Sequence, residues 1–186
     1  MGKQQQFFSA GQTLAGNYHF TPKHSFYGWF MYFLPGKFSN QFTATAKDPS
    51  TTPQQVNFIM NASWSYREFS VGWKYYFKGT AYNIDGYNIY GTAGLGLMFS
   101  KSSNTALVDT ALYYIAERPQ VGENSFARLN LDLGLGGEIP LAANIYLYSD
   151  LRTWINTSSY PVAVFHSDKN ATLALSLHVG LRLLFD

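Results

Sequence analysis

The chain has 186 residues, which is enough for one domain, placed at residues 1–186, and only 13% of them are charged whereas 18% are aromatic. A soluble domain is typically about 25% charged, and the net charge of +2 is too small for the electrostatic footprint of a nucleic-acid-binding protein. Because the chain has no cysteine, a disulfide framework, a thiolate metal site and a lipidated cysteine are excluded.

Three strands are expected within the first 46 residues, separated by two turns. The strands are Gln12–Phe20, Ser25–Leu34 and Gln41–Ala46. The turns are Thr21–His24 and Pro35–Asn40, and both contain proline, which punctuates regular structure.

A fourth expected strand, Val56–Phe77, is unusually long. Its apolar residues are even-numbered up to Tyr66 and odd-numbered from Phe69 onward. Because side chains alternate between the two faces of a strand, this change of parity indicates a β-bulge near Arg67 and Glu68.

Four further strands alternate apolar and polar residues almost without error. They are Ile89–Phe99, Ala127–Ile139, Asn144–Ile155 and Ala171–Phe185. In each, the odd-numbered residues are mostly apolar, so one face of the strand meets an apolar environment. The last of them is longer than the roughly 3–10 residues of a globular strand, whereas a membrane-spanning strand needs about 9–11.

The expected connections alternate in length along the chain. One set is Thr21–His24, Lys47–Gln55, Ser100–Ser125 and Asn156–Asn170, and the other is Pro35–Asn40, Lys78–Tyr87 and Pro140–Ala143. Long outer loops and short periplasmic turns are typical of outer-membrane barrels. The pattern predicts an all-β fold, an eight-stranded antiparallel up-and-down transmembrane β-barrel over residues 10–185, with both termini on the periplasmic side.

A soluble barrel of lipocalin or streptavidin type is the competing fold. It would carry many charges outside, whereas the polar face here holds glycine, small polar residues and four acids balanced by four bases. Unpaired buried charge is costly, so these residues and His178 are expected to form a paired interior network with Asp132 joined to Arg152. The members are Glu68, Lys74, Arg128, Asp132, Glu138, Asp150, Arg152, His178 and Arg182.

Three stretches carry a recognisable strand pattern: Val71–Phe77, Tyr90–Leu97 and Leu177–Phe185. Together they resemble the OmpA/OmpX-like small outer-membrane β-barrel superfamily, with the character of its Bacteroidota members. Members usually end on an aromatic residue, and here Phe185 is penultimate. The resemblance implies a bacterial outer-membrane location, with membrane lipid and lipopolysaccharide as neighbours, more than any one activity.

Export to that membrane needs a signal peptide, and Met1–Gln6 lacks its apolar core. We therefore interpret Met1 as an initiator on a mature chain. The most apolar run, Phe26–Leu34, has nine residues, whereas a transmembrane helix needs about 20.

No catalytic residue, cofactor or metal is expected. The sharpest enzymatic motif is His166-Ser167-Asp168. Some outer-membrane barrels are lipid A deacylases whose His and Ser lie two residues apart on one strand face, whereas His166 and Ser167 are adjacent and would point apart. No His, Asp and Glu spacing resembles a metal site, and no glycine-rich stretch precedes a helix as a nucleotide loop would.

The segment Ala106–Ala116 is unusually apolar for an outer loop. We interpret it either as a strand extension or short helix packed on the barrel rim, or as a contact surface for a partner or ligand. The residues concerned are Leu107, Val108, Leu112, Tyr113, Tyr114 and Ile115.

The sequence favours a non-enzymatic outer-membrane protein that presents its long loops to a partner or to the environment. Two alternatives stay open. One is a small passive channel for small or hydrophobic solutes, lined by Tyr90, Tyr146, Tyr148 and Trp154; the other is a lipid A-modifying enzyme that uses His166 or His178.

Overall fold

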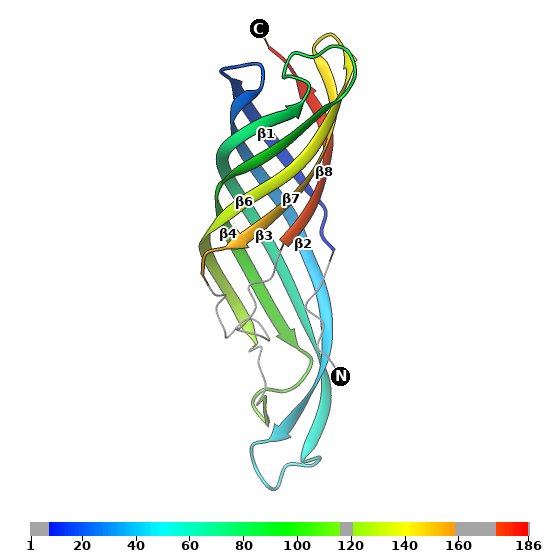
Figure 1. Ribbon diagram of the computed structural model, residues 1–186. Coiled ribbons are helices and arrows are strands. Elements are labelled where there is room, and N and C mark those ends of the chain that lie inside the picture. The colour runs from blue at the N-terminus through cyan, green and yellow to red at the C-terminus, as the bar shows by residue number, and fades with distance from the viewer. Residues whose placement is uncertain (1–7, 116–120, 159–173, 186) are drawn as a thin grey trace.

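The computed structural model describes residues 8–115, 121–158 and 174–185, which form one antiparallel sheet of eight strands. The strands are β1 (Gly11–His19), β2 (His24–Ala46), β3 (Gln55–Lys78), β4 (Asn88–Ala106), β5 (Tyr113–Tyr114), β6 (Gly122–Ala142), β7 (Ile145–Asn156) and β8 (Ala174–Leu183). They pair in the order β1-β2-β3-β4-β6-β7-β8, and the two-residue β5 pairs with β2. The strands are tilted and wrap around a common interior (Figure 1).

Eight strands were expected, but two of them differ from the expected ones. The turn at Pro35–Asn40 was wrong, because β2 runs without a break through this segment. Pro35 instead lies at a shift of the β2–β3 register between Phe33 and Gly36. Proline has no N–H to donate to a neighbouring strand, so it is tolerated at such a bulge. The total is nevertheless eight because of β5, a two-residue strand in the segment that was expected as an outer loop.

Merging the second and third expected strands reverses the direction of β1 relative to the expected barrel. β1 and β8 both run toward the end of the sheet that carries the connections 20–23, 79–87 and 143–144, hereafter the turn end (Figure 1). The expectation that Thr21–His24 shares an end with the long loops was therefore wrong. Both termini were expected on one side, whereas the start of β1 and the end of β8 lie at opposite ends of the sheet. The connection 47–54 and the described part of the connection after β4, residues 107–115, lie toward the opposite end (Figure 1).

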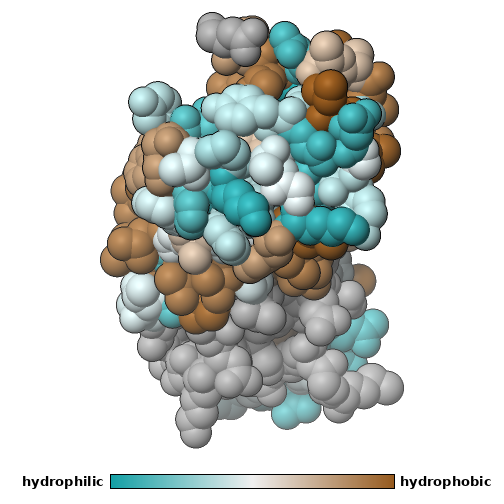
Figure 2. All heavy atoms as spheres, turned by 45° about the horizontal axis from the view of Figure 1, so that its top comes forward, coloured by the Kyte–Doolittle hydropathy of each residue, from teal (hydrophilic) through white to brown (hydrophobic). Residues whose placement is uncertain are grey.

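The outer face of the sheet near the turn end is apolar. The outward side chains are the odd-numbered residues of Phe69–Phe77, Ile89–Phe99, Ala127–Ile139 and Ile145–Ile155 and of the described part of Leu173–Phe185. We call this surface the apolar band. Figure 2 looks toward the turn end and shows hydrophobic side chains on the flanks and hydrophilic ones gathered on the end itself.

Beyond the band, β2, β3 and β4 continue into a projection, residues 36–65 and 100–115, which extends away from the turn end (Figure 1). On β3 its chemistry is the reverse of the band's. On β3 the inward side chains here are apolar and buried: Phe58, Met60, Ala62 and Trp64. The outward ones are Asn57, Ile59, Asn61, Ser63 and Ser65, of which only Ile59 is apolar.

The polarity of β3 inverts without any change in strand geometry. The expected bulge at Arg67 and Glu68 was wrong, because both residues pair in continuous register with β2 and with β4. Even-numbered residues face inward along the whole strand. The parity change in the sequence therefore marks a reversal in which face of β3 carries the apolar side chains, the inward face in the projection and the outward face in the band.

Candidate functional site

The interior of the sheet inside the apolar band holds most of the buried charge. Next to the projection lies an aromatic layer, in which Phe33 stacks on Tyr66 with ring centroids 4.4 Å apart and Trp154 packs edge-on against both. Nearer the turn end, six of the expected charged residues meet in two ion-pair groups. These groups and the hollow beside them form the candidate site.

The first group is centred on Arg152, on β7. Arg152 Nη1 lies 2.7 Å from Asp132 Oδ2 and Arg152 Nε lies 3.6 Å from Asp150 Oδ2, and all three side chains are almost completely buried. The Tyr27 hydroxyl donates a hydrogen bond of 2.9 Å to the same Asp132 oxygen. The Arg152 guanidinium also lies 3.5 Å above the ring of Trp29, within cation–π range. The Asp132–Arg152 pair is the one expected from the sequence.

The second group is centred on Glu138, on β6. Arg182 Nη2 lies 3.1 Å from Glu138 Oε1, and Lys74 Nζ lies 3.4 Å from Oε2. The Asn88 side chain donates a 3.0 Å hydrogen bond to Oε1, and its own carbonyl accepts from the backbone of Thr80. Through these two hydrogen bonds, Asn88 links Glu138 and its ion pairs to the connection between β3 and β4.

Three of the nine expected network residues lie apart from these groups. Glu68 is fully buried beside Gly96 and forms no ion pair with the described residues. Arg128 donates to the backbone carbonyl of Ser158. His178 contacts Ser176 and Thr13 instead of a charge. Among the described residues, these three therefore lie outside the two ion-pair groups.

Three members of the site escaped the sequence analysis: Tyr27, Trp29 and Asn88. In Ser25–Leu34 both faces carry large apolar residues, so alternation could not separate inward from outward side chains. Asn88 stands at the first position of β4, where asparagine usually indicates only a turn.

Glycines make room for these large interior side chains. A Cβ at Gly136 would collide with the Asp150 carboxylate and the Tyr90 ring, and one at Gly94 would collide with the Tyr27 hydroxyl. Close approach of a neighbouring group is one reason for glycine within a strand.

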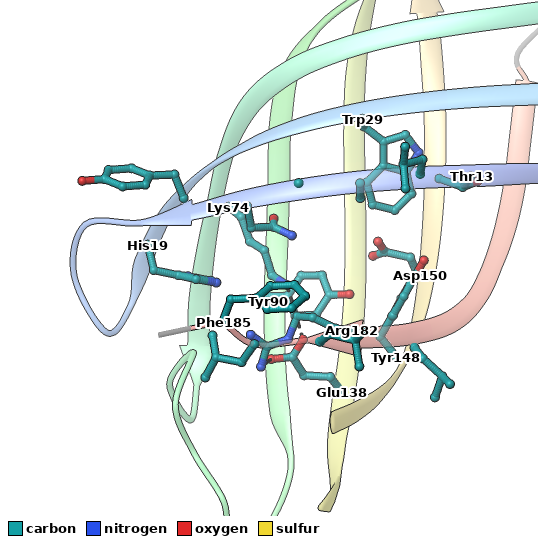
Figure 3. Close-up of a pocket in the computed structure, with 18 of the residues that line it drawn as sticks. Thr13, His19, Trp29, Lys74, Tyr90, Glu138, Tyr148, Asp150, Arg182 and Phe185 are labelled. Carbon is teal, nitrogen blue, oxygen red and sulfur yellow. Dashed lines mark hydrogen bonds and ion pairs between the residues drawn. The ribbon is translucent and has the colours of Figure 1, made fainter. Parts of the chain in front are cut away.

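A cavity of about 570 Å³ opens beside the second ion-pair group, between β1 and the end of β8. Its interior side is lined by Lys74, Glu138, Asp150, Arg152 and Arg182, together with Tyr90 and Tyr148. Its outer rim comes from β1 and from the chain between Leu181 and Phe185. Figure 3 shows Lys74, Tyr90, Glu138 and Arg182 converging at its floor, with Thr13 and Trp29 farther along β1 and β2. Of the four aromatic residues proposed to line a channel, Tyr90 and Tyr148 border this cavity, whereas Tyr146 and Trp154 are fully buried.

A serine and a histidine also meet in the interior. Ser176 Oγ lies 2.5 Å from His178 Nε2, and His178 Nδ1 lies 3.1 Å from Thr13 Oγ1. The two residues are two positions apart on β8, so both point inward. The sequence analysis named His166, whose motif lies outside the described residues, and His178, but it did not pair His178 with Ser176; their i, i+2 spacing was the available signal.

Within the described residues there is no group of three or more His, Cys, Asp or Glu placed to hold a metal ion. The same part of the chain includes no helix long and apolar enough to cross a membrane.

In the apolar segment expected as a contact surface, some side chains are packed inward and others are exposed. Val108, Tyr113 and Ile115 pack against the buried core of the projection, which consists of Phe42, Ala44, Phe58 and Met60. Leu107, Leu112 and Tyr114 remain exposed. The segment is therefore partly a strand extension and partly an accessible apolar surface.

Comparisons of the chain with protein-family models, with curated proteins and with solved structures found no match.

Proposed function

We propose that the chain is an integral outer-membrane β-barrel protein without enzymatic activity, which presents its projection to a protein partner at the cell surface. The observation that carries the proposal is the inversion of polarity along continuous strands. A strand with apolar side chains outward at one end and polar side chains outward at the other is suited to crossing from lipid into water.

The dimensions of the apolar band agree with this proposal. Its outward apolar run covers residues 69–77 of β3 and residues 89–99 of β4. These are nine and eleven residues, and a tilted membrane-spanning strand needs about 9–11. The buried ion pairs support the same view, because a polar interior behind an apolar exterior is the arrangement of membrane barrels. The resemblance to OmpA/OmpX-like barrels suggests the outer membrane as the location.

The projection supports a binding role because it is ordered by contacts between its connections. Lys47 Nζ donates to the carbonyl of Thr110 (2.7 Å), and the Tyr113 hydroxyl donates to the carbonyl of Pro53 (3.1 Å). The hydroxyl and the backbone N–H of Ser50 donate to Asp48 and hold the pKa of that carboxyl below its ordinary value. These contacts hold Leu112 and Tyr114 outward on a fixed surface, and exposed apolar residues of this kind suit a protein partner.

The sidedness of the protein can be tested by labelling single cysteines, since the chain has none of its own. Ser50→Cys lies in the connection 47–54, and Asp85→Cys is the matched position in the connection 79–87 at the turn end. With the full chain exported in a Gram-negative host, a membrane-impermeant maleimide should label Ser50→Cys in intact cells. Asp85→Cys should be labelled only after the outer membrane is permeabilised. Equal labelling of both in intact cells would refute the orientation and the spanning.

A second candidate function, a lipid A-modifying hydrolase, is favoured by one observation, the Ser176–His178 contact. A nucleophile within hydrogen-bond reach of a base that a third group orients is the general arrangement of covalent catalysis, and Thr13 occupies the third position here. Mass spectrometry of lipid A from expressing cells decides between the candidates. The first proposal predicts unchanged acyl chains; acyl loss that disappears in Ser176→Ala would replace it with the hydrolase.

A further inference from the structure

The two edge strands of the sheet, β1 and β8, face each other across a seam. Among the described residues, β1 pairs only with β2 and β8 only with β7, so each has one edge of backbone N–H and C=O groups without a neighbouring strand. The side chains of Thr13 and His178 meet across the seam, and the cavity opens from there toward the turn end. The two edges run in the same direction.

Side-chain exposure along the seam shows the same lack of a neighbour. The outward residues Leu14 on β1 and Leu177 on β8 are 76% and 70% exposed. Leu131 and Leu135, outward residues of β6 with strands on both sides, are 38% and 58% exposed. The difference is what a missing strand between β1 and β8 would produce.

The cavity in the seam carries a surplus of positive charge. Three bases line it, Lys74, Arg152 and Arg182, against two acids, Glu138 and Asp150. Arg182 is nine-tenths buried, and its Nε and Nη1 atoms have no hydrogen-bond partner among the described residues. An occupant with an inward acceptor, preferably a carboxylate, would satisfy these donors.

We propose that the seam receives a β-strand of a partner polypeptide, about as long as the nine-residue β1, running antiparallel to both β1 and β8. Its outward residues are apolar, and one inward residue is acidic and meets Arg182. A strand in this direction makes every pairing in the sheet antiparallel, whereas direct pairing of β1 with β8 would be parallel. The edge strands of a second copy do not meet this requirement. A second copy in the same membrane has the same orientation, so its β1 and β8 would be parallel to the β1 and β8 of the first.

The energetic reason is strongest in a membrane and to that extent rests on the proposed function. Unpaired backbone groups in hydrocarbon cost several kcal/mol each, so open sheet edges do not face lipid. Strand addition to an exposed edge is also a general mode of peptide binding in water. The inference from strand direction, exposure and charge therefore stands without the membrane.

The test uses the full chain in detergent micelles and a capped synthetic peptide. Its sequence copies Ile145–Thr153, the segment that already pairs antiparallel with β8. Asp replaces Tyr146, which is the residue that pairs with Arg182, and Ser replaces Asp150 and Arg152, so that the one inward acid lies opposite Arg182. A peptide of the same composition, reordered so that apolar residues no longer alternate, is the matched control. The readout is backbone hydrogen–deuterium exchange, resolved by strand.

The copied peptide should slow exchange in β1 and β8 together by about tenfold or more, because their edge amides gain partners. Exchange in β4, which is paired on both sides, should not change, and the reordered peptide should have no effect. Absence of protection at millimolar peptide would overturn the proposal, as would edge amides that exchange slowly in the protein alone. A further measurement with oleate tests the alternative that the cavity binds an amphiphile. Oleate binding without protection by the peptide would overturn the partner strand and make the cavity an amphiphile site.

Failure of the partner-strand proposal can be distinguished from failure of the proposed function. Peptide protection combined with failed surface labelling would refute the membrane orientation alone. Correct labelling without peptide protection would refute the partner strand alone.

Discussion

Replacing Arg152 with alanine should destabilise the fold by about 3–5 kcal/mol, the cost typical of removing one partner from a buried ion pair. Arg152 is the only base within 4 Å of Asp132 or Asp150 among the described ion pairs, and all three side chains are nearly inaccessible. Its loss leaves two buried carboxylates without a cation and also removes the contact with the Trp29 ring.

Urea unfolding of the protein in phospholipid vesicles measures this change. Lys101→Ala is the matched control, because Lys101 pairs with Glu123 at 2.7 Å but both side chains are more than half exposed. Such surface pairs contribute about 0–1 kcal/mol. The double variant Arg152→Met, Asp132→Asn should be less destabilised than Arg152→Ala, because it removes one of the two unpaired charges. Equal effects of Arg152→Ala and Lys101→Ala would contradict the structural role of the interior pairs.

The second large effect is expected on the outer face of β4. Leu95→Arg places a charge near the middle of the apolar band and should cost about 2–4 kcal/mol in a bilayer. Ser103→Arg is the matched variant, because it lies on the same strand and face but in the projection. It should change the stability by no more than about 0.5 kcal/mol, as is usual for surface substitutions.

The same unfolding measurement in vesicles compares the two arginine variants. The predicted difference depends only on which medium surrounds each position. If Leu95→Arg were as well tolerated as Ser103→Arg, the outer face of β4 would be in water along its whole length.

The regular strands could be predicted from the sequence because their two faces differ in chemistry. In Ala127–Ile139 every second residue is polar or glycine, and the structure places those residues inward as expected. The Asp132–Arg152 pair was predictable for the same reason, since parity and hairpin spacing together limit which interior charges can meet.

The errors arose where one chemical pattern has two physical causes. Pro35-Gly36 is typical of a turn, but the same residues also fit a β-bulge, and only pairing over the whole of β2 and β3 distinguishes the two. On β3, a parity change can result from an extra residue or from a reversal in which face carries the apolar side chains. The projection has an apolar core and a polar exterior, so the second cause applies.

The seam and the second ion-pair group depend on contacts between residues far apart in the chain. Asn88 binds Glu138 across 50 positions and Thr13 meets His178 across 165. Local periodicity contains no information on such contacts. The expected direction of β1 was wrong because of the single misassigned turn at Pro35–Asn40. That direction determines which strand the seam can receive.

The central claim is that the outward face of β3 passes from water into lipid near Arg67. Spin labels on single cysteines at the outward positions from Asn57 to Phe77, with the protein in bilayers, test it directly through their collision rates with oxygen and with a water-soluble nickel complex. Because oxygen concentrates in hydrocarbon, collisions with oxygen should dominate from position 69 to position 77, and collisions with nickel from position 57 to position 65. Nickel access that stays uniformly high along the whole strand would contradict the claim.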